Sequence, residues 1–256
     1  MSIPVNQNPA PWVYSAWGRL LARTWRMGRR ERCLVCAGPA PVAAGGLHGL
    51  CPDCAGAMPW SRHACPGCAL PLPDGEAGVA CGQCQRQPPP LHACHASFVY
   101  GFPLDRLLPG AKFHGDLAAS RALGEWMAAR MWRHLPDDAW PQALVPVPLH
   151  RTRLRQRGYD QALELARPLA RRLRLPLRDD LLTRVRDTAP QSRLDAAERR
   201  RNLRHAFAVR DDVRVPGHVV LVDDVMTTGT TLHAAARALR RAGVGRVDAW
   251  VCARVP

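Results

Sequence analysis

The segment 219–231 combines residue types that could bind a phosphorylated sugar. The apolar run Val219–Val222 predicts a short buried strand, and Asp223 and Asp224 follow it directly. A loop of small residues and the start of a helix come next, and their backbone N–H groups form a natural anion site. Two carboxylates would repel a phosphate directly, so they are better placed against hydroxyl groups or a cation nearby. A sugar phosphate meets both demands, with its phosphate on the loop and its diol on the carboxylates.

The loop itself supports this interpretation through Gly229 and its neighbours. Gly229 has no Cβ and therefore lets a ligand approach the backbone closely. Hydroxyl donors surround it at Thr227, Thr228, Thr230 and Thr231. The spacing differs from the Walker pattern, and the glycines are too few for a dinucleotide fold. The alternative is an ordinary helix start with threonine caps and two solvated aspartates.

Eight cysteines form four C-x-x-C pairs within 52 residues. The pairs are Cys33/Cys36, Cys51/Cys54, Cys65/Cys68 and Cys81/Cys84. Two residues between the sulfurs let both thiolates face one ion, and two pairs complete a tetrahedral zinc site. No open coordination position is evident, so we predict two structural Zn²⁺ ions. Sequential pairing gives two ribbons in series and closes the shorter loops. Alternating pairing, a cross-brace, is the other possibility.

Two cysteines lie outside these pairs. Cys252 falls in an apolar run near the C-terminus and is most simply a buried core thiol. Cys94 lies in the sequence His92-Ala93-Cys94-His95. A further metal site is conceivable there, but the lead-in to a strand is the favoured interpretation.

The composition sets outer limits on the class of protein. The chain has 256 residues, 47% of them apolar, and a formal net charge of +15, which eight thiolates around two Zn²⁺ would reduce to about +11. Of its 36 basic residues only Lys112 is a lysine. It lacks an apolar run of the ~18 residues that a membrane span needs, and its N-terminus does not resemble a secretory signal. We therefore expect a cytoplasmic protein, in which paired cysteines bind metal rather than form disulfides.

The pattern along the chain predicts three parts. Residues 1–32 contain tryptophans and leucines at helical spacing among arginines, an amphipathic helix that packs on the next module or, alternatively, lies on a membrane surface. Residues 33–84 form the double zinc ribbon, and the proline-rich stretch 85–90 is a stiff linker. Residues 91–256 form the larger domain.

Strand and helix patterns alternate in the larger domain. Alternation of this kind predicts an α/β fold, a mostly parallel sheet flanked by helices. The expected strands are Ser97–Phe102, Ala143–Leu149, Val219–Val222 and Arg246–Ala253. The expected helices are Asp116–His134, Tyr159–Leu173, the arginine-rich Arg193–Arg204 and Thr231–Ala242.

The segment from Val219 to Thr231 resembles the 5-phosphoribosyl-1-pyrophosphate (PRPP) motif of type I phosphoribosyltransferases, and the wider chain resembles the ComF family of competence-associated proteins. The similarity runs from about Cys33 to Arg254. Four further stretches carry the resemblance. The first is the Lys-Phe-x-Gly element, Lys112-Phe113-His114-Gly115, and the second is Val145–Pro148 with Arg155, Arg157-Gly158-Tyr159 and Gln161. The third comprises Thr188, Gln191, Leu194, Arg199, Asn202, Ala206 and Phe207, and the fourth is the set of paired cysteines. Asp160 stands where the family usually has Asn, and Thr230 where it has Ala. Asp160 adds negative charge near the expected anion site.

The resemblance implies a type I phosphoribosyltransferase fold and a set of site residues. Asp223 and Asp224 would contact the ribose hydroxyls, and Mg²⁺ would bridge diphosphate and ribose oxygens. The PRPP-binding loop would comprise Val225, Met226, Thr227, Thr228, Gly229, Thr230 and Thr231. The candidates for the leaving diphosphate are Lys112, Arg151, Arg153, Arg155 and Arg157. Lys112 also counts as a catalytic candidate, because a chain that otherwise uses arginine keeps a compact ammonium there; the alternative is a stray surface lysine.

Three functions compete at this point. The first is a Mg²⁺-dependent phosphoribosyltransferase with an unidentified acceptor. The second is a non-enzymatic single-stranded DNA-binding protein, favoured by the positive charge and the ribbons but not by an aromatic content of only 6%. The third is a regulator that senses PRPP without chemistry. The resemblance to ComF links the first two, since it implies a role in DNA uptake and partners among competence proteins.

Overall fold

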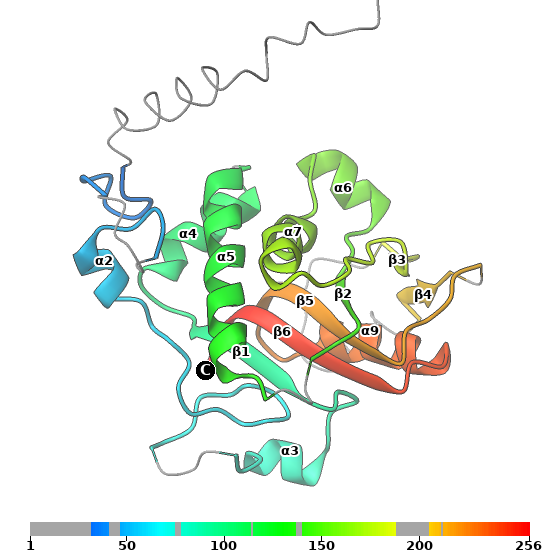
Figure 1. The fold of residues 1–256 in the computed structure, drawn as a ribbon. Coiled ribbons are helices and arrows are strands. Elements are labelled where there is room, and N and C mark those ends of the chain that lie inside the picture. The colour runs from blue at the N-terminus through cyan, green and yellow to red at the C-terminus, as the bar shows by residue number, and fades with distance from the viewer. Residues whose placement is uncertain are drawn as a thin grey trace, which may run out of the picture.

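The computed structural model describes residues 32–40, 47–74, 78–113, 115–136, 140–187, 205–210 and 212–256, without the side chains of Lys112 and Phe113 (Figure 1). The expected N-terminal amphipathic helix and the expected helix Arg193–Arg204 lie outside these residues. None of the described helices combines the length and the apolar character needed to cross a membrane.

Four parallel strands form the main sheet of the larger domain. They are β1 (Cys94–Val99), β2 (Ala143–Pro146), β5 (His218–Met226) and β6 (Arg246–Arg254), in the order β1-β6-β5-β2. Every neighbouring pair is parallel. The two long central strands, β5 and β6, are buried over most of their length, as expected of a sheet covered on both faces. The predicted parallel sheet is confirmed.

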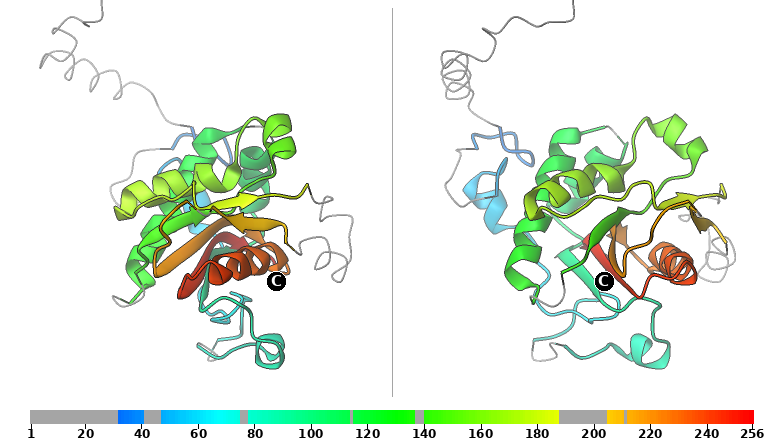
Figure 2. Two further views of the ribbon diagram at one scale, coloured as in Figure 1. Left: turned by 90° about the vertical axis from the view of Figure 1, so that its right-hand side faces the viewer. Right: turned by 45° about the vertical axis from the view of Figure 1, so that its right-hand side comes forward.

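Helices cover both faces of this sheet (Figure 2). The helices α4 (Leu104–Phe113), α5 (Leu117–His134) and α7 (Gln161–Leu173) share one core layer, and α9 (Thr230–Arg241) packs in the other. Alternation along β5 supplies both layers, because Val220 and Val222 belong to the first and Val219 and Leu221 to the second. The continuous apolar run in the sequence is therefore a strand buried on two sides.

Close helix packing depends on one glycine in α5. A Cβ on Gly124 would lie 2.5 Å from the carbonyl oxygen of Leu165 in α7, which no side chain could tolerate. The helix itself begins as its sequence predicts, since the Asp116 carboxylate accepts a hydrogen bond from the Ala119 N–H at 2.9 Å. α5 and α7 thereby form a fixed wall behind the sheet.

The cysteine-rich segments attach to both core layers at the edge strand β1. The first, which contains α2 (Pro52–Gly56), contributes Cys33 and Cys54 to the layer of α5. The second, which contains α3 (Gly82–Arg86), contributes Ala69 to the layer of α9. Between them Trp60 forms an antiparallel bridge with Phe98 of β1. α2 and α3 consequently lie well apart, α2 at the left of the view and α3 at its lower edge (Figure 1).

Several elements differ from the sequence prediction. β5 runs from His218 to Met226, so it includes Asp223 and Asp224 rather than ending before them. β2 ends at Pro146, although the Val147 N–H still donates to the Val222 carbonyl at 2.9 Å. The sequence analysis also missed four short or polar elements: α4, α6 (Arg151–Arg157), β3 (Leu182–Arg184) and β4 (Phe207–Val209). α6 buries no residue and therefore leaves no apolar periodicity to detect.

Candidate functional site

β5 leads directly into the phosphate loop, which we define as residues 227–229. The carbonyl of Met226, the last residue of the strand, accepts hydrogen bonds from the Val255 N–H at 3.0 Å and the Arg254 guanidinium at 3.3 Å. At the other end the Thr228 hydroxyl, inside the loop, lies 2.7 Å from the hydroxyl of Thr230, the first residue of α9. Hydrogen bonds thus restrain the chain on both sides of the loop, and the N-terminus of the twelve-residue helix α9 follows it directly.

Gly229 adopts a backbone conformation that favours glycine, in addition to lacking a Cβ. It caps α9 with φ at +74°, the left-handed region, and its carbonyl accepts from the His233 N–H at 2.9 Å. A Cβ at this position would lie 2.4 Å from Cε of Met226 and 3.0 Å from Nε2 of His233. The backbone conformation therefore favours glycine at the end of the loop, and a Cβ would require the ends of the Met226 and His233 side chains to shift.

The two adjacent carboxylates lie at the end of β5, just before the loop. Asp223 is half-buried, whereas only 6% of Asp224 is exposed. The Asp224 N–H donates to Oδ1 of Asp223 at 2.9 Å, and the Val225 N–H donates to Oδ1 of Asp224 at 2.8 Å. Their charges act on different neighbours, since Asp223 opposes the lowering of the Arg184 pKa by burial, whereas Asp224 adds to the raising of the Asp160 pKa by burial. The carboxylate pair therefore influences both Arg184 of β3 and Asp160, the N-cap of α7.

Arg184 brings a buried cation to this cluster. It ends β3, is 9% exposed, and its guanidinium lies 5.5 Å from the ring centroid of Phe207. Burial lowers the pKa of Arg184 and the charge of Arg153 lowers it further, while Asp223, Asp187 and Asp160 act in the opposite direction. A positive group thus faces the carboxylates from the neighbouring two-stranded sheet.

The basic candidates from the sequence are distributed unevenly around the site. Arg151, Arg155 and Arg157 all lie in α6, where Arg151 and Arg155 are exposed and Arg157 bonds Gln161. Arg153, also in α6, forms an ion pair with Asp187, whose Oδ1 lies 4.0 Å from Nε of the arginine. Lys112 lies in the last turn of α4, and its side chain is outside the described structure. Arg153 thus contacts Asp187, and both charges act on Arg184.

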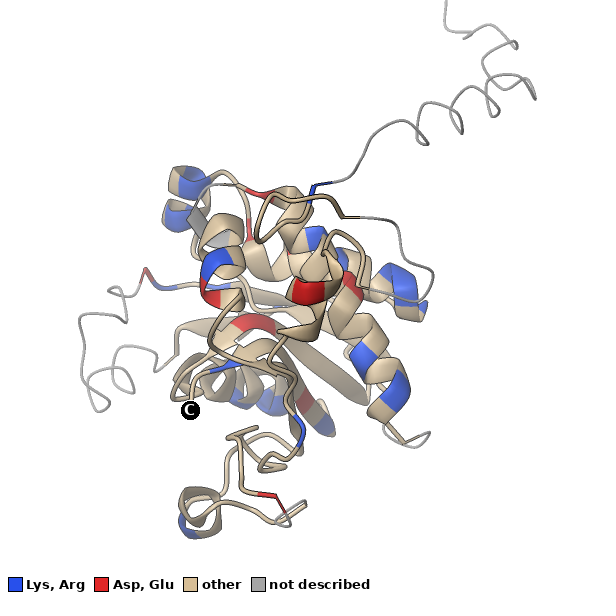
Figure 3. Cartoon of the chain, turned by 90° about the vertical axis from the view of Figure 1, so that its left-hand side faces the viewer, with Lys and Arg blue, Asp and Glu red and all other residues tan. Residues whose placement is uncertain are grey.

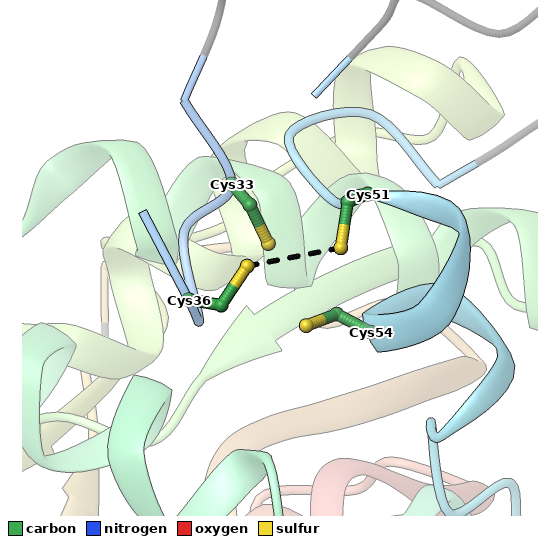
Figure 4. A group of neighbouring side chains, drawn as sticks. All are labelled: Cys33, Cys36, Cys51 and Cys54. Atoms are coloured by element: carbon green, nitrogen blue, oxygen red, sulfur yellow. Dashed lines mark hydrogen bonds between the residues drawn. The ribbon is translucent and has the colours of Figure 1, made fainter. Parts of the chain in front are cut away.

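The eight paired cysteines form two separate clusters, grouped as sequential pairing predicts. In each cluster the four Sγ atoms lie within 4.8 Å of one another. The first cluster is Cys33, Cys36, Cys51 and Cys54, and its sulfurs converge on one point (Figure 4). The second is Cys65, Cys68, Cys81 and Cys84. The cross-brace alternative is excluded by this grouping.

The spacing of the sulfurs fits a tetrahedral zinc ion. Sγ of Cys36 and Cys51 are 3.8 Å apart, and Sγ of Cys68 and Cys81 are 3.7 Å apart. A tetrahedron with Zn–S bonds of about 2.3 Å has edges of about 3.8 Å. Burial opposes ionisation of the Cys33 thiol, but backbone N–H donors outweigh it and lower its pKa to about 6. Thiolate ligands at this distance are what Zn²⁺ requires.

The two clusters are built alike. In each, the first pair sits in a tight turn with a residue of positive φ directly after it, Ala37 or Ala69. The second pair opens a five-residue helix, α2 or α3, with Cys51 or Cys81 at the N-cap. Cys94 belongs to neither cluster: it lies in β1, and its thiol donates to the sulfur of Met226 at 3.6 Å. The strand begins at Cys94 itself and ends at Val99, so it lies three residues earlier than the expected Ser97–Phe102.

The comparisons with known proteins agree with this geometry. The model of the phosphoribosyl transferase domain matches residues 160–256. The DNA utilization protein YhgH of Salmonella typhi is 37% identical over 228 residues, which cover 87% of this chain and 96% of that protein. Competence protein F of Haemophilus influenzae is 34% identical with the same coverage, and competence protein ComFC of Bacillus subtilis is 29% identical over 71% of this chain and 73% of its own. The chain belongs to the ComF family.

Two of the ComF sequence blocks meet in the structure. The Gly115 N–H, from the Lys-Phe-x-Gly element, donates to the Tyr159 hydroxyl at 3.1 Å. Gly115 has φ at +64°, and a Cβ there would contact the Tyr159 ring at 3.7 Å. Tyr159 follows Gly158, the left-handed C-cap of α6. This bond joins the chain after α4, which carries Lys112, to the arginine-rich helix.

The departure from the ComF pattern at Asp160 has a structural reason. Its Oδ1 accepts from the N–H groups of Ala162 and Leu163, so it is the N-cap of α7. Its Oδ2 accepts from the Leu149 N–H at 2.8 Å, which fixes the chain between β2 and α6. Burial raises the pKa of Asp160, with Asp224 adding to the effect, while these three N–H groups lower it. An Asn could accept the two capping bonds through Oδ1, but its amide nitrogen could not accept the bond from the Leu149 N–H.

Sequence reasoning missed Arg184 and His233. Alternation in β3 places Arg184 on the same face as the buried Leu182, and this pattern was a signal that it faces inward. His233 is in the first turn of α9, four residues after Gly229, and its Nε2 is buried with no hydrogen-bond partner in the described structure. Burial lowers the pKa of His233 to about 4, with Arg237 adding to the effect. Its proximity to Gly229 followed from helical spacing alone.

Proposed function

We propose that this ComF protein binds PRPP together with Mg²⁺ and transfers its phosphoribosyl group to an acceptor. The observation that carries this proposal is the sequence of features at the end of β5: two carboxylates, a glycine-centred loop tied at both ends, and the N-terminus of α9. Backbone N–H groups of Thr227, Thr228 and Gly229, with the threonine hydroxyls, bind the 5-phosphate. Asp223 and Asp224 accept hydrogen bonds from the ribose hydroxyls.

The reaction breaks the bond between C1 of the ribose and the diphosphate oxygen, and the electron pair leaves with diphosphate. A nucleophilic atom of the acceptor forms the new bond to C1. Positive charge that develops on the ribose ring is stabilised by the carboxylates of Asp223 and Asp224. Mg²⁺, when bound, neutralises the diphosphate oxygens. Lys112 and the α6 arginines, Arg151, Arg153, Arg155 and Arg157, attract the leaving diphosphate.

The two cysteine clusters have a structural role in this proposal. Each holds one Zn²⁺ through four thiolates, which leaves no position open for a substrate. Their sulfurs lie in segments that pack against the two faces of the sheet, at β1. Zinc therefore stabilises the edge of the sheet and takes no part in the transfer.

A second candidate function comes from the names of the relatives, which are DNA utilization protein and competence protein. It is a non-enzymatic accessory role in DNA uptake, either by binding single-stranded DNA or by sensing PRPP. The net charge of +15 favours contact with a polyanion. Release of diphosphate from PRPP would distinguish the enzyme from the DNA-binding protein and from the PRPP sensor. Strongly salt-dependent DNA binding that persists after Asp223 and Asp224 are replaced would favour the accessory role.

Isothermal titration with PRPP and Mg²⁺ tests the main proposal. We expect Asp223→Asn/Asp224→Asn to weaken PRPP binding at least tenfold, because the diol and its cation lose two charged partners. The matched control is Asp179→Asn/Asp180→Asn, which neutralises another adjacent pair, between α7 and β3. Equal PRPP affinity in all three proteins, or no PRPP binding by the wild type, would overturn the proposal.

A further inference from the structure

A cavity of about 460 Å³ lies between the first cysteine segment and the last two turns of α5. The described residues that line it are Leu47, Ala55, Trp60, Arg62, Ala129, Arg130, Arg133 and His134. None of them belongs to β5, the phosphate loop or α9, so the cavity is separate from the proposed PRPP site. Its volume is within the usual range for small-molecule sites.

The cavity concentrates positive charge. Arg62, Arg130 and Arg133 line it, and no carboxylate does so among the described residues. Arg130 bonds the Ser61 carbonyl and Nε2 of His134, which fixes its guanidinium in place. Burial lowers the pKa of Arg130 and the charge of Arg62 lowers it further. Figure 3 shows basic positions on several helices, with acidic positions between them. An anion would relieve this repulsion.

The remaining wall is apolar and includes a fixed aromatic ring. Trp60 forms a backbone bridge with Phe98 of β1, and the two rings pack with centroids 4.5 Å apart. The Ser61 N–H donates to the Ser97 carbonyl at 3.0 Å, which holds the next residue to the same strand. A rigid indole beside cations suits a ligand that has a flat, apolar part and an anionic part.

We propose that this cavity binds a nucleoside phosphate, with its base against Trp60 and its phosphate on Arg62 and Arg133. Arginine forks match phosphate oxygens, and aromatic rings of proteins commonly stack on nucleobases. The nucleoside phosphate can come from a free nucleotide or from one unit of a single strand, and the site uses the same chemistry for both. This inference does not depend on PRPP binding.

Titration calorimetry of the full chain with adenosine 5′-monophosphate (AMP) tests the proposal, with adenosine and inorganic phosphate as separate probes. We expect AMP to bind at least tenfold more tightly than either fragment. Arg62→Gln/Arg133→Gln, at two exposed positions, should weaken AMP binding at least tenfold. Trp60→Leu should weaken AMP binding about tenfold and leave phosphate binding unchanged. Because Trp60 packs in the core, its variant is interpreted only if its far-ultraviolet circular dichroism matches the wild type.

Control variants separate this site from the phosphate loop. Arg86→Gln/Arg241→Gln removes two exposed charges elsewhere and should bind AMP as the wild type does. AMP is also a ribose 5-phosphate that the phosphate loop could bind, so the titration is repeated in the Asp223→Asn/Asp224→Asn background. There Arg62→Gln/Arg133→Gln should weaken the remaining AMP binding at least tenfold. Titration with a 5′-phosphorylated single-stranded oligonucleotide distinguishes the two sources of the nucleoside phosphate. If the oligonucleotide binds more tightly than AMP and this binding depends on Arg62 and Arg133, the natural ligand is a single strand. If the two bind equally tightly, the natural ligand is a free nucleotide. Unchanged AMP binding in Arg62→Gln/Arg133→Gln, or phosphate binding as tightly as AMP, overturns the proposal.

Discussion

Gly229 is the residue on which the shape of the phosphate loop depends most directly. We expect Gly229→Ala to lower the free energy of unfolding by about 1–2 kcal/mol, because φ of +74° is unfavourable for a residue with a Cβ. The new methyl group would also displace the ends of the Met226 and His233 side chains beside the loop, so PRPP affinity should fall. Urea unfolding and PRPP titration measure the two effects.

The control for this substitution lies at the other end of α9. Gly243 has φ at +95°, and a Cβ there would meet no atom within 4 Å. Gly243→Ala should therefore lose a similar amount of stability and keep its PRPP affinity. If both variants weaken PRPP binding equally, the loop geometry is not what holds the ligand.

His233 gives the molecule a specific dependence on pH. Burial lowers its folded-state pKa from 6.5 to about 4, so between these values the unfolded chain binds a proton that the folded chain does not. Stability should consequently fall as the pH is lowered from 7 to 5. We expect His233→Gln to remove about 1–2 kcal/mol of that loss, measured by urea unfolding at both pH values. The control is His92→Gln, at an exposed histidine, which should lose as much free energy of unfolding between pH 7 and pH 5 as the wild type does. If His233→Gln loses as much as the wild type over the same interval, the prediction is wrong.

Individual site residues can be recognised from the sequence where their type is unusual for their position in the chain. Gly229, the adjacent Asp223 and Asp224, and the cysteine pairs all stand out by type and spacing. Asp160 and Arg184 do not, because one caps a helix and contacts a distant loop, and the other gains its neighbours only when β3 pairs with β4. Contacts of this kind are set by tertiary packing, which spacing along the chain does not encode.

Among the elements, the C-terminal end of β6 links the second cysteine cluster to the phosphate loop. Arg254 is 9% exposed, and its Nε donates to the Cys68 carbonyl at 3.0 Å. Its Nη1 donates to the carbonyl of Met226, which directly precedes the loop. One side chain thus connects a zinc ligand to the strand that carries the carboxylates.

Arg254→Met should therefore affect both stability and binding. It keeps the unbranched start of the side chain but removes the guanidinium. The Cys68 carbonyl then loses the Arg254 donor and the Met226 carbonyl keeps the Val255 N–H, which costs about 1–3 kcal/mol. We also expect weaker PRPP binding, since the end of β5 loses a restraint. Arg246→Met, at the start of the same strand, removes bonds to Asp248 and should lower stability without changing PRPP affinity. Thermal unfolding and PRPP titration of both variants check this, and unaltered PRPP affinity in Arg254→Met would refute the link.

The elements themselves were predictable where apolar periodicity was strong. α5, α7, α9 and β6 lie within one or two residues of their expected bounds, because each presents a clear buried face. β5 was expected to end at Val222, since aspartates normally leave strands, yet it continues through Asp223 and Asp224 to Met226. Pairing with β6 through Met226 and Arg254 supplies the hydrogen bonds that overcome this preference.

The whole molecule is organised around β1, where the two cysteine segments reach opposite core layers. Cys33 and Cys54 belong to the layer of α5 and α7, while Ala69 belongs to the layer of α9. The sequence suggested a module followed by a linker, and it carried no sign of these contacts, because they join residues far apart in the chain. Zinc loss at either cluster should therefore weaken the entire fold rather than one end of it.

Cys54→Ser and Cys84→Ser test this arrangement, with one ligand removed from each cluster. Elemental analysis should give two zinc ions per wild-type chain and one in each variant, and both variants should unfold at a lower temperature because metal binding contributes to folding. Only Cys84→Ser should also weaken PRPP binding, because the second cluster alone is bonded to Arg254 through Cys68. Fewer than one metal ion per wild-type chain would remove the zinc assignment. Equal loss of PRPP affinity in both variants would show instead that the clusters act only through overall stability.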